Sequence, residues 1–164
     1  MLSSDPGLTG AIALLDSERG LLACEDLPTC ANGTATGSMK RWLDTDALEA
    51  LLTQWSKQHD FAEHSVFAVI ERPIPMPSLP AQTIASQFDT FGVLRAALAR
   101  RVPDAHMRYV NPRDWKTSFG LSRDKNASRE CCLRLYPSAP VNKVRFHNRA
   151  EAILIGHFLM RELA

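Results

Sequence analysis

Three acidic residues of this 164-residue chain lie where a carboxylate is unexpected. Asp5 comes directly before a Pro-Gly turn and the apolar run 10–16. Glu71 ends the apolar run 66–70, and Glu151 lies between two alanines at the start of an apolar helical pattern. Acidic side chains are rarely buried alone, and converging carboxylates repel one another unless cations lie between them. A site with only oxygen ligands favours a hard divalent cation, with Mg²⁺ as the first choice.

The distribution of charge indicates what such a site acts on. The net charge is +1, but residues 1–70 hold four Lys/Arg and ten Asp/Glu, whereas residues 95–145 hold twelve and four. A basic segment on a nearly neutral protein predicts one positive face with a polyanion as its partner. The alternative is a solvated surface without a partner. Together with the three carboxylates, the basic segment favours a metal-dependent enzyme of nucleic acids.

The elements that position these residues alternate between strands and helices. Hydrophobic periodicity predicts a hairpin of strands at 10–16 and 20–27, strands at 65–73 and 105–112, and helices at about 46–55, 84–101, 126–137 and 147–163. Residues 28–39, 74–80 and 113–125 are predicted to be loops or polar connections. This order predicts an α/β domain with a mixed sheet, formed by residues 1–164 as a single unit.

Capping signals define the expected starts of two helices. Asp46 and Glu49 have the spacing of a capping box, and either Asn126 or Ser128 is available to cap the helix that follows. In the last helix, Glu151 has helical spacing to Leu154, so it is expected on or beside the packing face.

Other features limit where the protein is expected to act. No apolar run approaches 18 residues, so no membrane span is expected. The N-terminus lacks the basic and apolar regions of a secretion signal. The four cysteines lack C-x-x-C spacing, and Cys131 and Cys132 are expected to be buried as small apolar residues in a reducing cytosol.

Four motifs in this order carry a family resemblance. They are "DPGLTGAIALLD" (5–16), "VFAVIERP" (66–73), "NPRDWKTSFGLSRDK" (111–125) and "HNRAEAILIG" (147–156). The sequence resembles RuvC-type Holliday junction resolvases of the ribonuclease H-like superfamily, from about residue 3 to residue 160. The WK and HxRAEA details are most similar to the phage and prophage branch. The resemblance implies a central mixed five-stranded sheet flanked by helices.

The resemblance also implies a reaction and a set of roles. The expected activity is paired, Mg²⁺-dependent cleavage of four-way DNA junctions, with two Mg²⁺ in each active site and Mn²⁺ as a substitute. Asp5 would bridge the metals, Glu71 and Glu151 would each hold one, and position 148 would complete the second site. Lys116 would contact the phosphate near the scissile bond.

The remaining expected DNA contacts follow from the same motifs and from the basic segment. They are Lys116, Lys125, Arg72, Met76, Arg123, Lys143 and Arg145. Met76 and Leu79 are either apolar wedges against unpaired bases or residues packed under their loop. Trp115 is expected to be a packing anchor that orients Lys116.

Two features depart from the family pattern. Only "MLSS" precedes Asp5, where the family has several apolar residues, so the first strand is expected to be very short. Asn148 stands where related sequences usually have Asp or sometimes His, which leaves three formal negative charges instead of four. His147 is either a substitute ligand or a surface residue at the helix cap. An inactivated variant at Asn148 is therefore an alternative to an active nuclease.

Three functions remain open at this point. The first is a homodimeric junction resolvase, with the helix at 81–101 as the interface, acting in the cytoplasm of a bacterium or a phage-infected host. The second is a junction-binding protein that does not cut because of Asn148. The third is a sugar-kinase-like or actin-like phosphate site, which would need two such domains.

Overall fold

The computed structural model describes residues 1–31, 41–122 and 124–164. Five strands form the central sheet, in the order β3-β2-β1-β6-β7. Their bounds are β1 (Leu2–Asp5), β2 (Ala11–Asp16), β3 (Gly20–Asp26), β6 (Ala68–Glu71) and β7 (Met107–Val110). β1 pairs antiparallel with β2, and β2 with β3, whereas β1–β6 and β6–β7 are parallel. The predicted mixed five-stranded sheet and its hairpin are confirmed.

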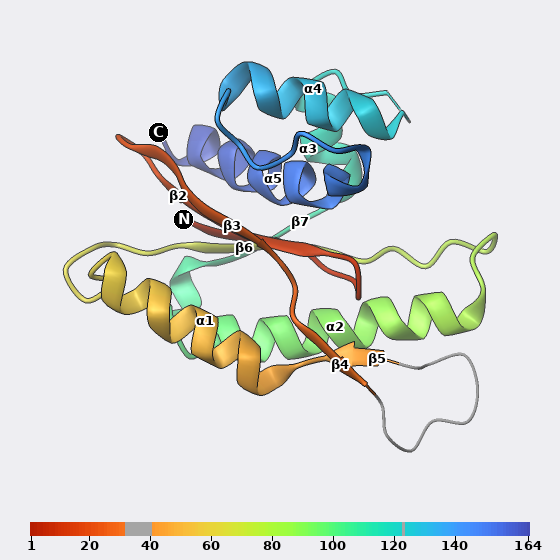
Figure 1. Ribbon diagram of the computed structural model, residues 1–164, viewed down its shortest axis with the longest axis horizontal. Coiled ribbons are helices and arrows are strands. Elements are labelled where there is room, and N and C mark those ends of the chain that lie inside the picture. Colours follow the sequence, from red (N-terminus) through yellow and green to blue (C-terminus); the bar gives the residue numbers. More distant parts are fainter. Residues whose placement is uncertain (32–40, 123) are drawn as a thin grey trace.

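Helices cover both faces of the sheet (Figure 1). One face carries α1 (Thr45–Gln58) and α2 (Ala81–Ala99). The other carries α3 (Pro112–Ser118), α4 (Lys125–Leu135) and α5 (His147–Leu163). Short 3₁₀ turns η1 (Asp104–His106) and η2 (Val144–Phe146) precede β7 and α5. Among the described residues, no helix is long and apolar enough to cross a membrane.

The alternation of side chains along the strands produces two cores. Ala11, Ala13 and Leu15 of β2 face α5, whereas Ile12 and Leu14 face the α1–α2 layer. These five residues are buried on one face or the other, as expected for a strand covered on both sides. Cys131 and Cys132 are buried in the α4–α5 core, as predicted.

α5 lies unusually close to β1, and this contact places its N-terminal turn. A Cβ atom at Gly156 would come within 2.6 Å of both Ser3 Oγ and Leu15 Cδ1. One turn earlier, buried Ser3 donates a hydrogen bond of 2.7 Å to the Ala152 carbonyl. Because Gly156 has no side chain, α5 can pack directly on the sheet, and the Ser3 hydrogen bond holds it there. This packing places residue 151 over the strand ends.

Two predictions about irregular segments are wrong. Within the predicted loop 28–39, Thr29–Ala31 forms β4, which pairs with β5 (Arg41–Leu43) in a separate two-stranded sheet. Residues 32–40 lie outside the described part. Within the predicted connection 113–125, Pro112–Ser118 forms α3, because Pro112 is well placed in the first turn and Trp115 is completely buried.

The predicted helix caps are wrong by two or more residues. Asp44, not Asp46, caps α1 by accepting a hydrogen bond from the Ala47 backbone N–H. Asp124, not Asn126 or Ser128, caps α4 by accepting from the Asn126 backbone N–H. In both cases the caps lie just ahead of the apolar pattern from which the helix was inferred.

Candidate active site

Asp5 and Glu71 lie at the ends of neighbouring parallel strands. The β1–β6 register pairs Ser4 with Ile70. Asp5 and Glu71 are the next residues on these two strands, so they lie side by side where the parallel strands end. The chain then turns sharply after Asp5. A Cβ atom at Gly10 would lie 2.1 Å from the Asp5 carbonyl oxygen, so only glycine permits this approach. The carboxyl ends of parallel strands are where α/β proteins commonly bind ligands.

Glu151 reaches this edge from α5, in the layer above the sheet. Its carboxylate pairs with Lys116 of α3, whose Nζ lies 3.2 Å from Oε1 and 3.1 Å from Oε2. Ser128 of α4, which is 3% exposed, donates a hydrogen bond of 3.1 Å to Glu151 Oε1. Three helices therefore fix the position of one carboxylate.

The three acids, Asp5, Glu71 and Glu151, form a carboxylate cluster with excess negative charge. Burial raises the pKa of Asp5 well above its usual range, and the charges of Glu71 and Glu151 raise it further. Lys116 acts in the opposite direction on Asp5. Burial also raises the pKa of Glu71 to about 7, although Trp115 and Lys116 oppose this shift. One lysine does not neutralise three acids, so the cluster favours binding of additional cations.

The donor set suits a hard divalent cation, but the side chains are held by other partners. Among the described residues, no three acidic, histidine or cysteine side chains are gathered tightly enough to hold one metal ion. Glu71 and Glu151 instead bond to Trp115, Lys116 and Ser128. All three cluster members offer carboxylate oxygens and electrostatically favour a cation, so their chemistry fits Mg²⁺ or Mn²⁺.

Trp115 contributes more than the predicted packing. It is completely buried, and its Nε1–H donates a hydrogen bond of 2.6 Å to Glu71 Oε2. Lys116 Nζ lies 5.0 Å from the centroid of the same ring. Trp115 therefore orients both Glu71 and Lys116. The sequence does not indicate the bond to Glu71 because the two residues are 44 positions apart.

Asn148 and His147 lie at the start of α5 and are both partly exposed. Asn148 Nδ2 donates to the backbone oxygen of Thr9 and, at 3.2 Å, to Thr9 Oγ1. This amide therefore connects α5 to the turn that follows Asp5. His147 Nδ1 lies 3.3 Å from the Val144 carbonyl oxygen, in the turn just before its own helix.

The residues expected to contact DNA are scattered over exposed segments. Arg72, Met76, Lys143 and Arg145 are all exposed, and Arg145 lies over the Phe146 ring. Arg123 and the Lys125 side chain lie outside the described part of the structure, although the Lys125 backbone begins α4.

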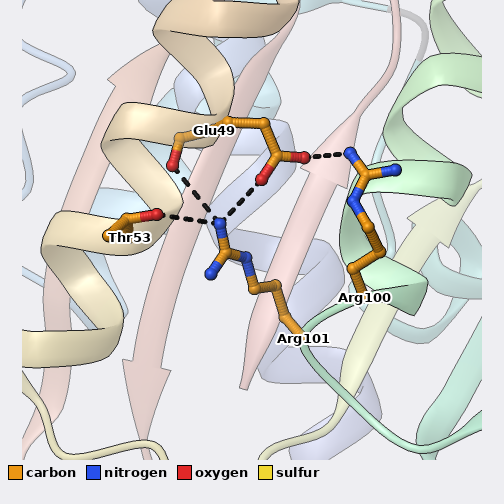
Figure 2. A network of polar contacts seen from close by, with 4 residues as sticks. All are labelled: Glu49, Thr53, Arg100 and Arg101. Carbon is orange, nitrogen blue, oxygen red and sulfur yellow. Dashed lines mark hydrogen bonds and ion pairs between the residues drawn. The ribbon is translucent and has the colours of Figure 1, made fainter.

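Part of the basic segment is neutralised within the protein. Figure 2 shows an arginine clamp formed by Glu49, Thr53, Arg100 and Arg101. Glu49 pairs with both arginines, and Arg101 Nη2 also donates to Thr53 Oγ1 at 2.9 Å. The Arg100 hydrogen bond is the main reason that the pKa of Glu49 falls below its usual value. These two arginines link α2 to α1 and are not freely available to DNA.

The mixed sheet with helices on both faces is the ribonuclease H-like fold. Among the solved structures that are similar to this chain, two match it over nearly its whole length. The first is Thermus thermophilus RuvC in complex with Holliday junction substrate, at a TM-score of 0.62 and 11% identity, covering 98% of this chain and 94% of that one. The second is another Thermus thermophilus RuvC structure, at a TM-score of 0.54 and 12% identity, covering 98% and 95%. No family model and no curated protein matches the sequence.

Proposed function

We propose that this chain is a structure-selective endodeoxyribonuclease that resolves four-way DNA junctions. The observation that carries the proposal is the convergence of Asp5, Glu71 and Glu151 from two parallel strand ends and a helix. Burial there, together with the charges of Glu71 and Glu151, raises the pKa of Asp5. The similarity to a RuvC structure that holds a Holliday junction supports this substrate class. The proposal includes a homodimer that uses α2 and acts in the cytoplasm of a bacterium or a phage-infected host.

In this proposal, Asp5, Glu71, Glu151 and the side chain at 148 hold two divalent cations. Bound Mg²⁺ or Mn²⁺ would activate water and stabilise the leaving 3′ oxygen. Trp115 keeps the Glu71 carboxylate oriented, and Ser128 does the same for Glu151. Lys116 pairs with Glu151, and its ammonium group would contact a phosphate of the bound DNA at the same site.

The remaining expected contacts belong to the same proposal. Arg72, Met76, Arg123, Lys125, Lys143 and Arg145 would hold the junction arms. Arginine and lysine contacts to phosphates fix the position of a protein on DNA, and they make its affinity depend on salt. Cleavage and binding are therefore expected to weaken as ionic strength rises.

Asn148 supports a second candidate function, a protein that binds junctions without cutting them. Its amide donates to the Thr9 carbonyl, which a carboxylate cannot do. The surroundings of position 148 therefore suit an amide side chain. Compared with aspartate, asparagine brings one negative charge fewer to a metal site. Tight junction binding with no cleavage under any divalent cation would favour this function.

The experiment compares the wild type with Asn148→Asp. Synthetic four-way junctions and linear duplexes of the same sequence are incubated with Mg²⁺ or Mn²⁺, and metal binding is measured by calorimetry. We expect paired cuts only in the junction, with tighter metal binding by Asn148→Asp because it adds a charged ligand. Asn142→Asp, at an exposed position in the loop before α5, controls for the added charge.

Two results would contradict these expectations. If neither protein cuts, or if both cut linear duplex as well as the junction, the chain is not a resolvase. If Asn148→Asp binds metal with the same affinity as the wild type, position 148 is not a ligand.

A further inference from the structure

A lysine side chain lies within the carboxylate cluster, where the donor set suits a cation. The Lys116 ammonium group is 3.1 and 3.2 Å from the two oxygens of Glu151 and 5.0 Å from the centroid of the Trp115 ring. The indole N–H of Trp115 is in turn bonded to Glu71. Burial raises the pKa of both Asp5 and Glu71, and in each case the charge of Lys116 opposes the rise. This one ammonium group therefore acts on all three acids.

The two side chains that hold Glu151 differ in charge and in freedom to move. Ser128 is neutral and 3% exposed, and it bonds only to Oε1. Lys116 is charged and contacts both oxygens, and its side chain is 35% exposed. A lysine has a long flexible stem, so Lys116 can turn toward solvent while the Ser128 hydrogen bond keeps the carboxylate in place. Oε2 would then be available to another cation.

A divalent cation has a stronger claim on this position than an ammonium group. Three carboxylates face one lysine charge in the cluster, and carboxylate oxygens are the ligands that a hard divalent cation prefers. Yet among the described residues no three such side chains are gathered tightly enough to hold a metal ion. The Lys116–Glu151 ion pair is part of the reason, because it directs Glu151 toward α3.

We propose that Lys116 is a resident cation that competes with the divalent metal for Glu151. Metal binding and the Lys116–Glu151 ion pair would exclude each other, and loading of the site would free the ammonium group for a phosphate. This inference rests on the proposed function, which includes both the metal and the phosphate contact. It assigns Lys116 a second role, since the lysine also stabilises the metal-free cluster and lowers its affinity for metal.

The test measures Mn²⁺ binding by calorimetry in the absence of DNA. Lys116→Gln should bind Mn²⁺ more tightly than the wild type by about 5-fold or more, because the competing charge is gone. Lys116→Arg keeps a positive charge and should retain the weaker affinity. Lys57→Gln, at an exposed position on α1, removes the same charge on the other side of the sheet and should bind as the wild type does.

The other partner of Glu151 should have an effect of opposite sign. Ser128→Ala should weaken Mn²⁺ binding by about 10-fold, because side chains that orient a metal ligand commonly contribute this much to affinity. Alanine is smaller than serine and keeps the position apolar, so the variant is expected to fold, which urea unfolding checks.

Stability gives a second measure that does not depend on cleavage. In a chelator, Lys116→Gln should unfold at a lower temperature than the wild type, because three acids then face one another without the ammonium group. Added Mn²⁺ should raise the unfolding temperature of the variant more than that of the wild type, because the tighter-binding protein gains more from the same metal concentration.

The proposal is overturned if Lys116→Gln binds Mn²⁺ no more tightly than the wild type, or if neither protein binds it. It is also overturned if Ser128→Ala gains affinity as Lys116→Gln does, because any loosening of Glu151 would then have the same effect. Junction cleavage by the wild type separates the two proposals. Cleavage without a gain in affinity by Lys116→Gln rejects only the resident cation. A gain in affinity without junction cleavage by the wild type rejects only the resolvase.

Discussion

The carboxylate cluster and the arginine clamp are two charge clusters with opposite imbalances. The carboxylate cluster has three acids and one lysine, and the pKa values of Asp5 and Glu71 are raised. The clamp has one acid and two arginines, and the pKa of Glu49 is lowered. Folding therefore stabilises the ionised carboxylate of Glu49, whereas it destabilises the ionised carboxylates of Asp5 and Glu71. The clamp therefore stabilises the contact between α1 and α2, and the carboxylate cluster is a site whose ionised form needs an additional cation.

The largest expected effect separates the two clusters by activity. Glu71→Gln should reduce junction cleavage by about 10³-fold, because an amide provides a weaker ligand for a cation that stabilises several kcal/mol of transition-state charge. Its carbonyl can still accept the Trp115 hydrogen bond, so the fold should persist. Rates are measured by single-turnover cleavage with Mg²⁺. The same exchange at Glu49 serves as the control and should leave the rate within a few-fold of wild type.

A Glu71→Gln protein that cuts at the wild-type rate would remove Glu71 from the site. If Glu71→Gln loses cleavage and also unfolds at a much lower urea concentration than the wild type, Glu71 is needed for folding and its role in catalysis is not supported.

The next effect separates the clusters by pH, in the absence of metal. Glu71 binds its proton more tightly in the folded protein than in the unfolded chain, because its pKa rises from 4.5 to about 7. Its contribution to stability is therefore complete below pH 4.5 and is lost as the pH rises through 7. We expect the Glu71 contribution to the free energy of unfolding to fall by at most on the order of 3 kcal/mol across this window. Urea unfolding in a chelator at closely spaced pH values measures it.

The clamp should give a pH dependence of the opposite sign. The lowered pKa of Glu49 contributes stability that is present above 4.5 and is lost on acidification below that value. Glu71→Gln should reduce the fall in stability between pH 4.5 and 7 without abolishing it, because the raised pKa of Asp5 acts in the same direction. It should leave the acidic limb unchanged. Added Mg²⁺ should also reduce this fall in stability. A profile that is the same in Glu71→Gln as in the wild type would contradict the assignment.

The contrast between the clusters also indicates what sequence reasoning can reach. Apolar runs predicted β2, β6 and α5, because burial on both faces leaves a continuous signal. They did not predict β1, whose four residues contain two serines. The acids were recognisable because each lies at the end or the start of such a run. α3 was missed because its seven residues contain one buried side chain, Trp115, and show no helical periodicity.

The partners of these acids could not be predicted in the same way. Ser128 and Glu151 are 23 positions apart, and Glu49 and Arg101 are 52 positions apart. Such pairs depend on how helices from separate parts of the chain are packed, which a local pattern does not contain.

The smallest expected effect tests the clamp itself. Glu49→Gln should lower the free energy of unfolding by about 1–2 kcal/mol, because two guanidinium groups lose a charged acceptor that is partly exposed. For a chain of this size the midpoint of thermal unfolding falls by about 2–4 °C per kcal/mol. Glu18→Gln, at an exposed position in the β2–β3 turn, should change stability by less than about 0.5 kcal/mol. If the two variants are equally stable, the clamp does not contribute to folding. Arg100 and Arg101 would then be as available to DNA as the rest of the basic segment.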